Sequence, residues 1–565
     1  MTEDQRYSLS EEASVFLESV KDLESTLFFE VYLEGDLPSE LRGYRDLIEE
    51  KLENFKEFTN GKIDFAFMDP KSDVNGEPNE IEKEIYNEGK GILPVEPRFT
   101  DHNGESKFFR IWPGAKLSYN QNGITKESYV QFIPPVNVTD LEMLHAYVNS
   151  TISDIEYKLA SAIRELTKHN KKRIGFLQGH GELNPEETVT AKILLNKNYY
   201  FNEVTINDSI GKLDDFDGLI IADPKTPFSI KDLFVIDQFV LNGGKLMVFM
   251  NTLDINKDSL NYNWGAHTTR RRMKIEDMLF DYGIKINENY VMDVNCMQRK
   301  YNFQNSNLRI KTDKPDFPFL YHVVATPNMH PISKNLNRIA LELTNELSFT
   351  KKEEYRCAPI ISASNNSKVS RQAPLITFLD YKQYGTPIDL NNGASNEITI
   401  GASVSGVFKS YFEDKPWSID TTYTNDTNAR YISSSKKESH ILVIGNGKFI
   451  ANAVDSFPLS DGRMVYRRAE NFVRDLAFDR NNSTYNGSSK IDNAIFFQNI
   501  VDFMLDDLNI ISLRNKEIKL KEMDRKKIAN NRNFYTIINV AFPTLFIAFV
   551  GFTFWFFRKR LYSKR

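Results

Sequence analysis

The amino-acid sequence predicts an α/β protein with a doubly wound, mostly parallel sheet, preceded by an α+β domain and followed by a C-terminal transmembrane helix. Three observations carry this prediction. From residue 172 onward, short apolar strands alternate with helices, as in a sheet covered by helices on both faces. The first 170 residues mix strands, a hairpin pattern and helices without that alternation. Residues 534–557 form an uncharged apolar run long enough to span a bilayer.

The first 170 residues are expected to form one α+β domain. Apolar residues at helical spacing over 41–59 predict an amphipathic helix between two strands. A thioredoxin-like arrangement fits this order, but no Cys-x-x-Cys motif is present, so redox chemistry is not implied. The expected elements are a strand at 26–35, a helix at 41–59, a strand at 62–70, a hairpin of 107–120 with 128–135, and a helix at 141–166 with Thr139 as its N-cap.

Residues 171–510 are expected to form the α/β domain. Residues around 300–430 are richer in Asn, Ser, Thr and Lys, which predicts insertions or a smaller subdomain there. The sequence shows no internal repeat. The expected elements are strands at 173–178, 199–206, 217–224, 245–251, 284–293 and 440–452, and helices at 186–196, 229–241, within 264–282 and at 493–508.

The C-terminal apolar run is interpreted as a membrane anchor. Its 24 residues reach about 36 Å at about 1.5 Å per helical residue, enough for a hydrocarbon core of about 30 Å. The run extends from Phe534 to Phe557, with Tyr535 and Trp555 where aromatic rings favour the two membrane interfaces. Pro543 lies inside the run and is tolerated in a spanning helix.

The charges that flank the anchor indicate its orientation only in part. The tail at 558–565 begins with Arg558, Lys559 and Arg560, which favours a cytoplasmic tail and a body outside the cytoplasm. The juxtamembrane segment at 511–533 is basic as well, so charge alone does not choose a side.

Composition narrows the class of protein. A hydrophobic fraction of 41% and a charged fraction of 26% are typical of an ordered globular body. The net charge of −6 argues against nucleic acid as a partner. Two cysteines, Cys296 and Cys357, exclude a disulfide framework; whether they pair is left open, and free buried thiols are favoured. The eight histidines show no metal-binding spacing, so neither a metal nor another cofactor is expected.

One loop is the candidate ligand-binding site. Gly179, His180, Gly181 and Glu182 directly follow a predicted core strand, and Asp223 ends the next one. In open α/β sheets, ligands bind beyond the carboxyl ends of the strands, and adjacent His and Glu side chains can do acid–base chemistry. The alternative, which we favour, is a tight glycine turn in which His180 and Glu182 bond to neighbouring loops.

No catalytic residue is predicted. The chain has neither the GxGxxG spacing of a dinucleotide site nor a P-loop, so it should not hydrolyse ATP itself. It also lacks a GxSxG elbow, and neither cysteine follows a strand as a nucleophile would. The run from Arg270 to Arg272 offers an anion grip, although a solvated basic run is the favoured interpretation.

Several strings together resemble the GldG family, the gliding-motility-associated ABC transporter auxiliary proteins of Bacteroidota. They are TEDQRYSLS, VYLEGDLP, FLQGHGE, the DGLIIADP…LNGGKLMVFMN block and ISLRNKEIKLKEMDRKKI. The resemblance implies a glutamine-amidotransferase-like module, shared with intraflagellar-transport proteins, that keeps the fold and lacks the catalytic cysteine. Members usually carry another membrane helix just before the first string, so the resemblance implies an upstream start and a second span.

The resemblance also implies a function and partners. We expect a non-catalytic auxiliary subunit beside an ABC permease and an ABC ATPase, serving gliding motility or associated secretion. It would sit in the bacterial inner membrane, in contact with lipid, with a periplasmic body and a cytoplasmic tail; homo-oligomerisation is left open. Two alternatives remain: a solute-binding receptor for the transporter, and a hydrolase or amidotransferase-like enzyme that uses His180 and Glu182.

Overall fold

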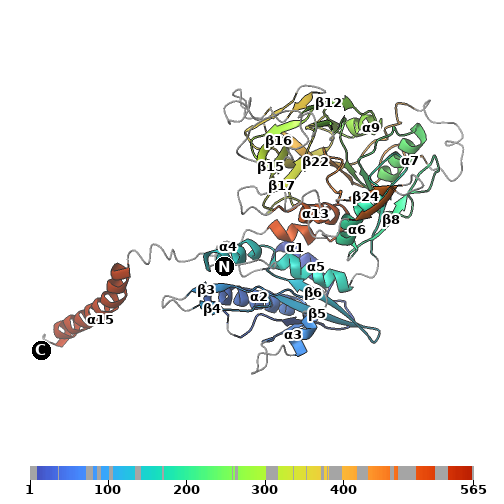
Figure 1. Cartoon of the computed structure of the whole chain (residues 1–565). Coiled ribbons are helices and arrows are strands. Elements are labelled where there is room, and N and C mark those ends of the chain that lie inside the picture. Colours follow the sequence, from blue (N-terminus) through green and yellow to red (C-terminus); the bar gives the residue numbers. More distant parts are fainter. Residues whose placement is uncertain are drawn as a thin grey trace. The chain divides into compact units, whose positions relative to one another are not determined.

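The protein is a mixed α/β chain in the computed structural model, which separates into two compact units at residues 516 and 517. Figure 1 shows the elements, and each unit is treated by itself below. The structure describes residues 9–562 except 36, 71–79, 86–90, 101–105, 134–140, 168–170, 197, 257–258, 261–264, 301–315, 335, 352, 371–373, 378–379, 381–396, 416–430, 453, 459–463, 469–490, 509 and 516–531.

The first 167 residues build a four-stranded sheet and its helices. The sheet has the order β2-β1-β5-β6, in which β1 runs parallel to β2 and antiparallel to β5. Helix α2 connects β1 to β2 and buries an apolar stripe at helical spacing that includes Tyr44, Ile48 and Phe55. The elements are α1 (Glu11–Glu18), β1 (Leu27–Val31), α2 (Ser39–Phe58), β2 (Ile63–Phe67), α3 (Glu80–Ile85), β3 (Arg98–Thr100), β4 (Ser106–Phe108), β5 (Gly114–Gln121), β6 (Ile124–Gln131), α4 (Leu141–Ile152) and α5 (Ile155–Thr167).

Two local predictions in this region differ from the structure. The hairpin turns at Asn122 and Gly123, both with positive φ, so its strands lie at different positions from the predicted ones. The single helix expected at 141–166 is two helices, because the chain turns between them, where the Asp154 amide donates to the Thr151 carbonyl at 3.1 Å. Short polar residues compete with helical hydrogen bonds, which favours such a break. Thr139, the expected N-cap, lies outside the described residues.

A ten-stranded sheet forms the centre of the remaining body. Its parallel part has the order β8-β7-β9-β10-β23, which is the 2-1-3-4-5 order of one common doubly wound fold. The strands of this part are β7 (Arg173–Leu177), β8 (Tyr200–Val204), β9 (Gly218–Ala222), β10 (Lys245–Phe249) and β23 (Ser439–Ile444).

The expectation of a mostly parallel sheet is wrong, because antiparallel strands extend it beyond β23. They follow the order β23-β22-β19-β16-β15, with β17 also on β16. The region at 300–430 therefore supplies part of the main sheet. These strands are β15 (Cys296–Lys300), β16 (Asp316–Pro327), β17 (Ile339–Glu342), β19 (Arg356–Ser362) and β22 (Thr399–Gly406).

Residues 284–293 do not extend the main sheet, contrary to the prediction. They form two short strands, β13 and β14, which pair with β18 and β20 in separate two-stranded sheets. The remaining strands are β11 (Leu253–Ile255), β12 (Gly265–Arg270), β13 (Ile284–Ile286), β14 (Val291–Asp293), β18 (Leu347–Phe349), β20 (Ser367–Val369), β21 (Leu375–Thr377), β24 (Val454–Pro458) and β25 (Met464–Arg468).

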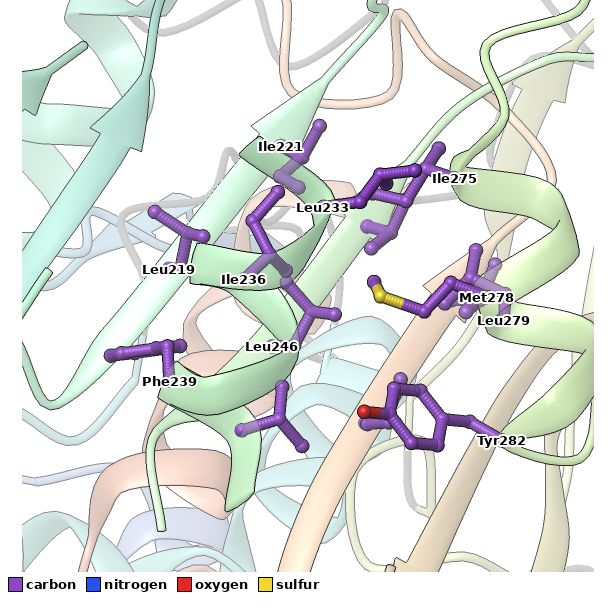
Figure 2. Close-up of a cluster of buried hydrophobic side chains, with 14 of the residues drawn as sticks. Leu219, Ile221, Leu233, Ile236, Phe239, Leu246, Ile275, Met278, Leu279 and Tyr282 are labelled. Atoms are coloured by element: carbon purple, nitrogen blue, oxygen red, sulfur yellow. The ribbon is translucent and has the colours of Figure 1, made fainter. Parts of the chain in front are cut away.

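Helices cover both faces of the parallel strands. Leu219 and Ile221 of β9 pack with α7 and α9 on one face, as Figure 2 shows. Ile220 and Ala222, which alternate with them, pack with α6 and α13 on the other. The helices are η2 (Pro185–Thr188), α6 (Val189–Leu195), α7 (Ile230–Leu241), α9 (Ile275–Asp281), α13 (Asn493–Leu505) and η5 (Ile510–Asn515).

The second unit contains helix α15 (Arg532–Tyr562), which includes the predicted anchor. Its stretch from Ala541 to Arg560 is long and apolar enough to cross a membrane, the one such helix among the described residues. Pro543 lies within the helix, and none of that stretch is buried. Length and composition are the basis of this assignment.

Cys296 and Cys357 are not joined by a disulfide bond. Cys296 lies at the start of β15 and is buried, which raises the pKa of its thiol to about 12. Cys357 lies in β19 and is half-buried.

Candidate functional site

The predicted site residues follow neighbouring parallel strands. The chain leaves β7 for β8 at one edge and returns to β9 on the other side of β7, so β7 and β9 flank the point where strand order reverses. Gly179, His180, Gly181 and Glu182 follow β7, and Asp223 follows β9. The structure therefore brings the two predicted parts of the site to the same edge of the sheet.

Backbone hydrogen bonds join the two loops directly. The His180 carbonyl accepts from the amides of Lys225 at 2.7 Å and Thr226 at 2.9 Å. Gly179 and Gly181 have φ values of 121° and 72°, which suit glycine and permit the tight turn around His180. A Cβ on Gly181 would lie 3.1 Å from Lys225 Cβ, so the loops also pack closely.

Carboxylates hold both ring nitrogens of His180. Nδ1 lies 3.2 Å from Glu182 Oε1, and Nε2 lies 2.9 Å from Asp232 Oδ2 on α7. The imidazole stacks on Phe228 with 3.9 Å between ring centroids, and its side chain is buried. The second Glu182 oxygen accepts from the His180 amide at 2.6 Å. The ring is thus fixed on its two edges and one face.

These contacts set the charge of His180. Burial lowers the pKa of His180, but hydrogen bonds to Asp232 and Glu182 outweigh it and raise the pKa to about 9. Burial conversely raises the pKa of Asp232, while the bonds from His180 and the Asp208 amide lower it more. At neutral pH, His180 is therefore an imidazolium that donates from both nitrogens. Such a ring has no lone pair with which to accept a substrate proton.

Asp223 is held in a strained and incompletely bonded state. Its φ is 51°, in the left-handed region that non-glycine residues seldom adopt. Oδ1 accepts from Arg271 Nη1 at 2.6 Å. Oδ2 is buried and has no hydrogen-bond partner among the described residues, and Lys225 Nζ is 3.9 Å away. A Cβ on Gly447 would lie only 3.0 Å from Asp223 Cα, so the loop after β23 presses against this residue.

Arg271 differs from the prediction of a solvated basic run. Its side chain is mostly buried and bridges Asp223 and Asp254, with Nη2 2.7 Å from Asp254 Oδ1. Arg270 instead projects to Glu288 at 2.9 Å. Arg270 is the last residue of β12 and Arg271 follows it outside the strand, and the two side chains reach different partners.

An asparagine pair connects the loops after β10 and β23. Asn251 Nδ2 donates to Asn345 Oδ1 at 2.7 Å and to the Gly445 carbonyl at 3.1 Å. Asn251 Oδ1 accepts from the Gly447 amide at 2.8 Å. Asn345 Nδ2 in turn donates to Thr252 Oγ1 at 3.0 Å. This network holds the loop that contacts Asp223.

Sequence reasoning did not identify Asp232, Asn251 or Asn345 as members of this cluster. Asp232 carried a usable signal, since Ser229 is a strong N-cap residue and Asp232 lies in the first turn, near the carboxyl ends of the strands. Asn251 directly follows β10 and could have been found in the same way. Asn345 lies between β17 and β18, so only the folded chain brings it here.

The described residues contain no cluster of three or more His, Cys, Asp or Glu side chains arranged to hold a metal ion. The predicted anchor residues belong to the second unit, on α15. Phe534 and Phe557 are exposed there, and Lys559 Nζ lies 4.9 Å from the Trp555 ring centroid. Arg558 and Arg560 belong to the same helix, whereas the Tyr535 side chain lies outside the described residues.

Comparison with known families finds two matches along the chain. Residues 171–479, which include the whole loop cluster, match a family described as an ABC-type uncharacterized transport system. Residues 3–118 match a domain of unknown function (DUF7088).

Individual relatives add little detail. An uncharacterized protein of Borreliella burgdorferi is 25% identical over 277 residues, which cover 47% of this chain and 51% of the relative. The chain thus spans about half the length of this curated relative. The mmIFT52 N-terminal domain matches at 15% identity and a TM-score of 0.27, covering 49% of this chain and 88% of that one. The exo-beta-1,4-mannosidase Op5Man5 from Opitutaceae bacterium strain TAV5 matches at 10% identity and a TM-score of 0.18, covering 44% and 38%. Both TM-scores are too low to indicate a shared fold.

Proposed function

This chain belongs to the family of ABC-type uncharacterized transport systems, whose model covers more than half of it, and on that premise we propose that it is a membrane-anchored, non-catalytic auxiliary subunit of an ABC transporter complex. Family membership associates the chain with ABC-type transport. The finer proposal is a GldG-type subunit with a role in gliding motility or the secretion that supports it. Its partners would be a separate permease and a separate ATPase.

The observation that carries the non-catalytic proposal is the bonding of His180. In open α/β sheets this edge is where reactive side chains reach a ligand. Here Glu182 and Asp232 occupy both ring nitrogens, and the raised pKa keeps the ring protonated. The His180 imidazole, the group best placed to act as a general base, therefore has both nitrogens engaged in hydrogen bonds within the protein. This supports the interpretation of the loop as a structural turn and weighs against the enzyme that uses His180 and Glu182.

The proposal includes a division of the chain into domains. We propose an N-terminal α+β domain at 1–170, which is thioredoxin-like, and an amidotransferase-like domain at 171–510 that contains an insertion within 300–430. The 2-1-3-4-5 order of the parallel strands supports a doubly wound core for the second domain. A juxtamembrane segment at 511–533, a span at 534–557 and a tail at 558–565 complete the proposal.

The proposed location is the bacterial inner membrane, with the body periplasmic and the tail cytoplasmic. The exposed apolar side chains along α15 support contact with lipid. The chain would then meet a permease within the same bilayer, and homo-oligomerisation is a further part of the proposal.

Isolation of the full-length chain from native membranes tests the proposal. A tagged chain in mild detergent should bring down one permease and one ATPase in constant ratio. His180→Gln and Glu182→Gln variants that reach normal levels should retain both partners and the transport-dependent phenotype. A chain that elutes alone in several detergents contradicts the auxiliary role. Loss of the phenotype with intact assembly would instead favour an enzyme.

One observation favours the solute-binding alternative. Within the part of the chain that the structure describes, the buried Asp223 Oδ2 has no hydrogen-bond partner, and such groups are uncommon unless a ligand or a functional constraint explains them. Titration of the full-length protein with candidate solutes, compared between the native chain and Asp223→Asn, checks this alternative. A solute whose affinity falls at least tenfold in the variant would support a receptor. Unchanged affinity would assign Asp223 a structural role.

A further inference from the structure

A second site lies away from the loop cluster, where the N-terminal region meets the α/β body. A pocket of about 340 Å³ is bounded by β6 and α5 on one side and by the end of α6, the two residues before β8 and α13 on the other. Its volume falls in the range of small-ligand sites, which often lie between domains. No residue of the candidate loop cluster lines it.

Aromatic and acidic side chains give the pocket its chemical character. Tyr157 and Tyr199 line it together with Glu165 and Asp502, whereas the Tyr129 side chain packs on the other face of β6, in the cluster around Trp112. Aromatic rings attract cations through their π faces, and carboxylates bind them through charge-assisted hydrogen bonds. The combination suits an ammonium or guanidinium group.

The two carboxylates differ in how they are compensated. Asp502 is neutralised from within the protein: Oδ1 accepts from Tyr199 at 2.6 Å and from Arg164 at 3.1 Å, and Oδ2 accepts from Tyr157 at 2.9 Å. Three hydrogen bonds, one of them from a guanidinium, therefore compensate this carboxylate within the protein. Asp502 therefore has a structural role in the wall of the pocket and is not the group that recognises a ligand.

Glu165 has no such compensation. Oε2 accepts a hydrogen bond from Ser128 at 2.7 Å, and no cationic side chain among the described residues pairs with the carboxylate. Lys158 also lines the pocket, but its ammonium donates to the Phe132 carbonyl at 2.6 Å. Glu165 thus presents a negative charge, half-buried and oriented by Ser128, to the pocket.

We propose that this pocket binds one ammonium or guanidinium group, with Glu165 as its counter-ion and the tyrosines as its aromatic wall. The group would belong either to a small organic cation or to a lysine or arginine side chain of a partner protein. Because α5 and α13 both contribute, the bound cation contacts the N-terminal region and the α/β body together. This site does not depend on the proposed transporter role.

Calorimetric titration of the full-length protein in detergent tests the proposal. The probes are n-butylammonium, n-butylguanidinium and the neutral n-butanol. Both cations should bind saturably and compete with each other, while the alcohol should show no saturable binding. Glu165→Gln keeps the shape of the side chain and should weaken cation binding at least tenfold. Glu57→Gln, on the exposed face of α2, is the matched control and should leave it unchanged.

A second variant and a second probe complete the test. Ser161→Phe places a bulky ring in the pocket and should abolish binding without removing any charge. Nα-acetyl-lysine N-methylamide carries the same ammonium on a peptide-like backbone. Tighter binding than n-butylammonium assigns the site to a partner's side chain, and weaker binding assigns it to a small free cation. Equal binding of n-butanol, or binding that both variants leave intact, overturns the proposal.

Discussion

The loops after β7 and β9 hold two buried side chains, His180 and Asp223, whose surroundings differ. His180 has a partner for each ring nitrogen and an aromatic ring beneath it. Asp223 has a φ of 51°, and one of its carboxylate oxygens accepts no hydrogen bond from any residue that the structure describes. Strain and unpaired buried groups persist only where neighbouring structure imposes them. The contacts of His180 therefore stabilise the site. The strained backbone of Asp223, in contrast, is imposed by the surrounding loops.

Replacing His180 should give a pH-dependent loss of stability. The pKa of His180 is raised from its ordinary value near 6.5 to about 9, so its bonds stabilise the fold fully below about pH 6.5. That contribution is lost as the pH rises through about 9. The difference in unfolding free energy between the native chain and His180→Gln should be up to about 3 kcal/mol at pH 6 and should shrink by pH 10.

Urea unfolding of the body at several pH values measures this difference. His267→Gln, at an exposed position of β12, is the control and should show a small difference at every pH. A His180→Gln effect of constant size across the pH range would contradict the charged imidazole.

Two glycine positions should respond oppositely to alanine. A Cβ at Gly447 would lie 3.0 Å from Asp223 Cα, so Gly447→Ala should destabilise the body by about 1–3 kcal/mol. Gly43 is exposed within α2 and has no atom near its Cβ position, so Gly43→Ala should stabilise it by about 0.5–1 kcal/mol. Urea midpoints for both variants check the prediction, and a destabilising Gly43→Ala would contradict it.

Buried charged side chains connect α5 of the N-terminal region to the C-terminal end of α13 in the α/β body. Arg164 of α5 lies 3.1 Å from Asp502 and 3.3 Å from Asp506, and all three side chains are buried. Tyr157 and Tyr199 add hydrogen bonds to Asp502. η5 then returns the chain to α5 and α1, so these elements couple the two regions.

Removing the Arg164 guanidinium from the contact between α5 and α13 should destabilise the body. Arg164→Met leaves two buried carboxylates without a counter-ion, which should destabilise the body by about 3–5 kcal/mol. Arg173→Met, at the exposed first residue of β7, should change it by less than about 0.5 kcal/mol. Urea unfolding measures the stability of both variants. Similar midpoints for the two would show that the ion pairs of Arg164 contribute little to the free energy of unfolding.

For the whole chain, the proposed membrane span accounts for the apolar side chains of the second unit. α15 has exposed phenylalanines along its length, and a long exposed apolar helix is unfavourable in water. A bilayer of ordinary thickness would cover it. The body at 9–515 has its own cores on both faces of the main sheet.

A charge in the middle of α15 should impair membrane insertion. Leu545 lies near the centre of the run, where arginine costs about 2.5–3.5 kcal/mol. Leu545→Arg should therefore move part of the chain from the carbonate-resistant membrane fraction to the soluble fraction. Leu545→Ala is the matched control and should stay in the membrane. Equal retention of both variants would contradict a single span centred on this residue.

Local patterning predicted much of the element order, and long-range contacts explain the differences. The core strands β7, β9 and β10 lie within their predicted ranges, because short apolar runs between turn signals report burial directly. The antiparallel strands β16, β19 and β22 were not predicted, because they lie in a polar region whose composition suggested insertions. Their pairing joins residues far apart in sequence, and no local pattern encodes it.

The candidate site likewise contains residues that the sequence predicted and residues that only the fold reveals. Loop position after β7 and β9 identified His180, Glu182 and Asp223, because the carboxyl ends of parallel strands share an edge. Asp232 lies 52 residues from His180, and Arg271 lies 48 residues from Asp223. These partners decide whether the side chains are reactive or locked, and only the fold brings them together.

The sequence by itself determined the apolar helix at the C-terminus, the alternation of the α/β body and the loop that carries His180. Each of these depends on residues near one another in the chain, through helical or strand periodicity and turn chemistry. The tertiary structure alone decided the antiparallel half of the sheet, the locked state of His180 and the pocket beside Glu165. Those features arise from contacts between distant segments, whose free energy depends on which surfaces the folded chain brings together.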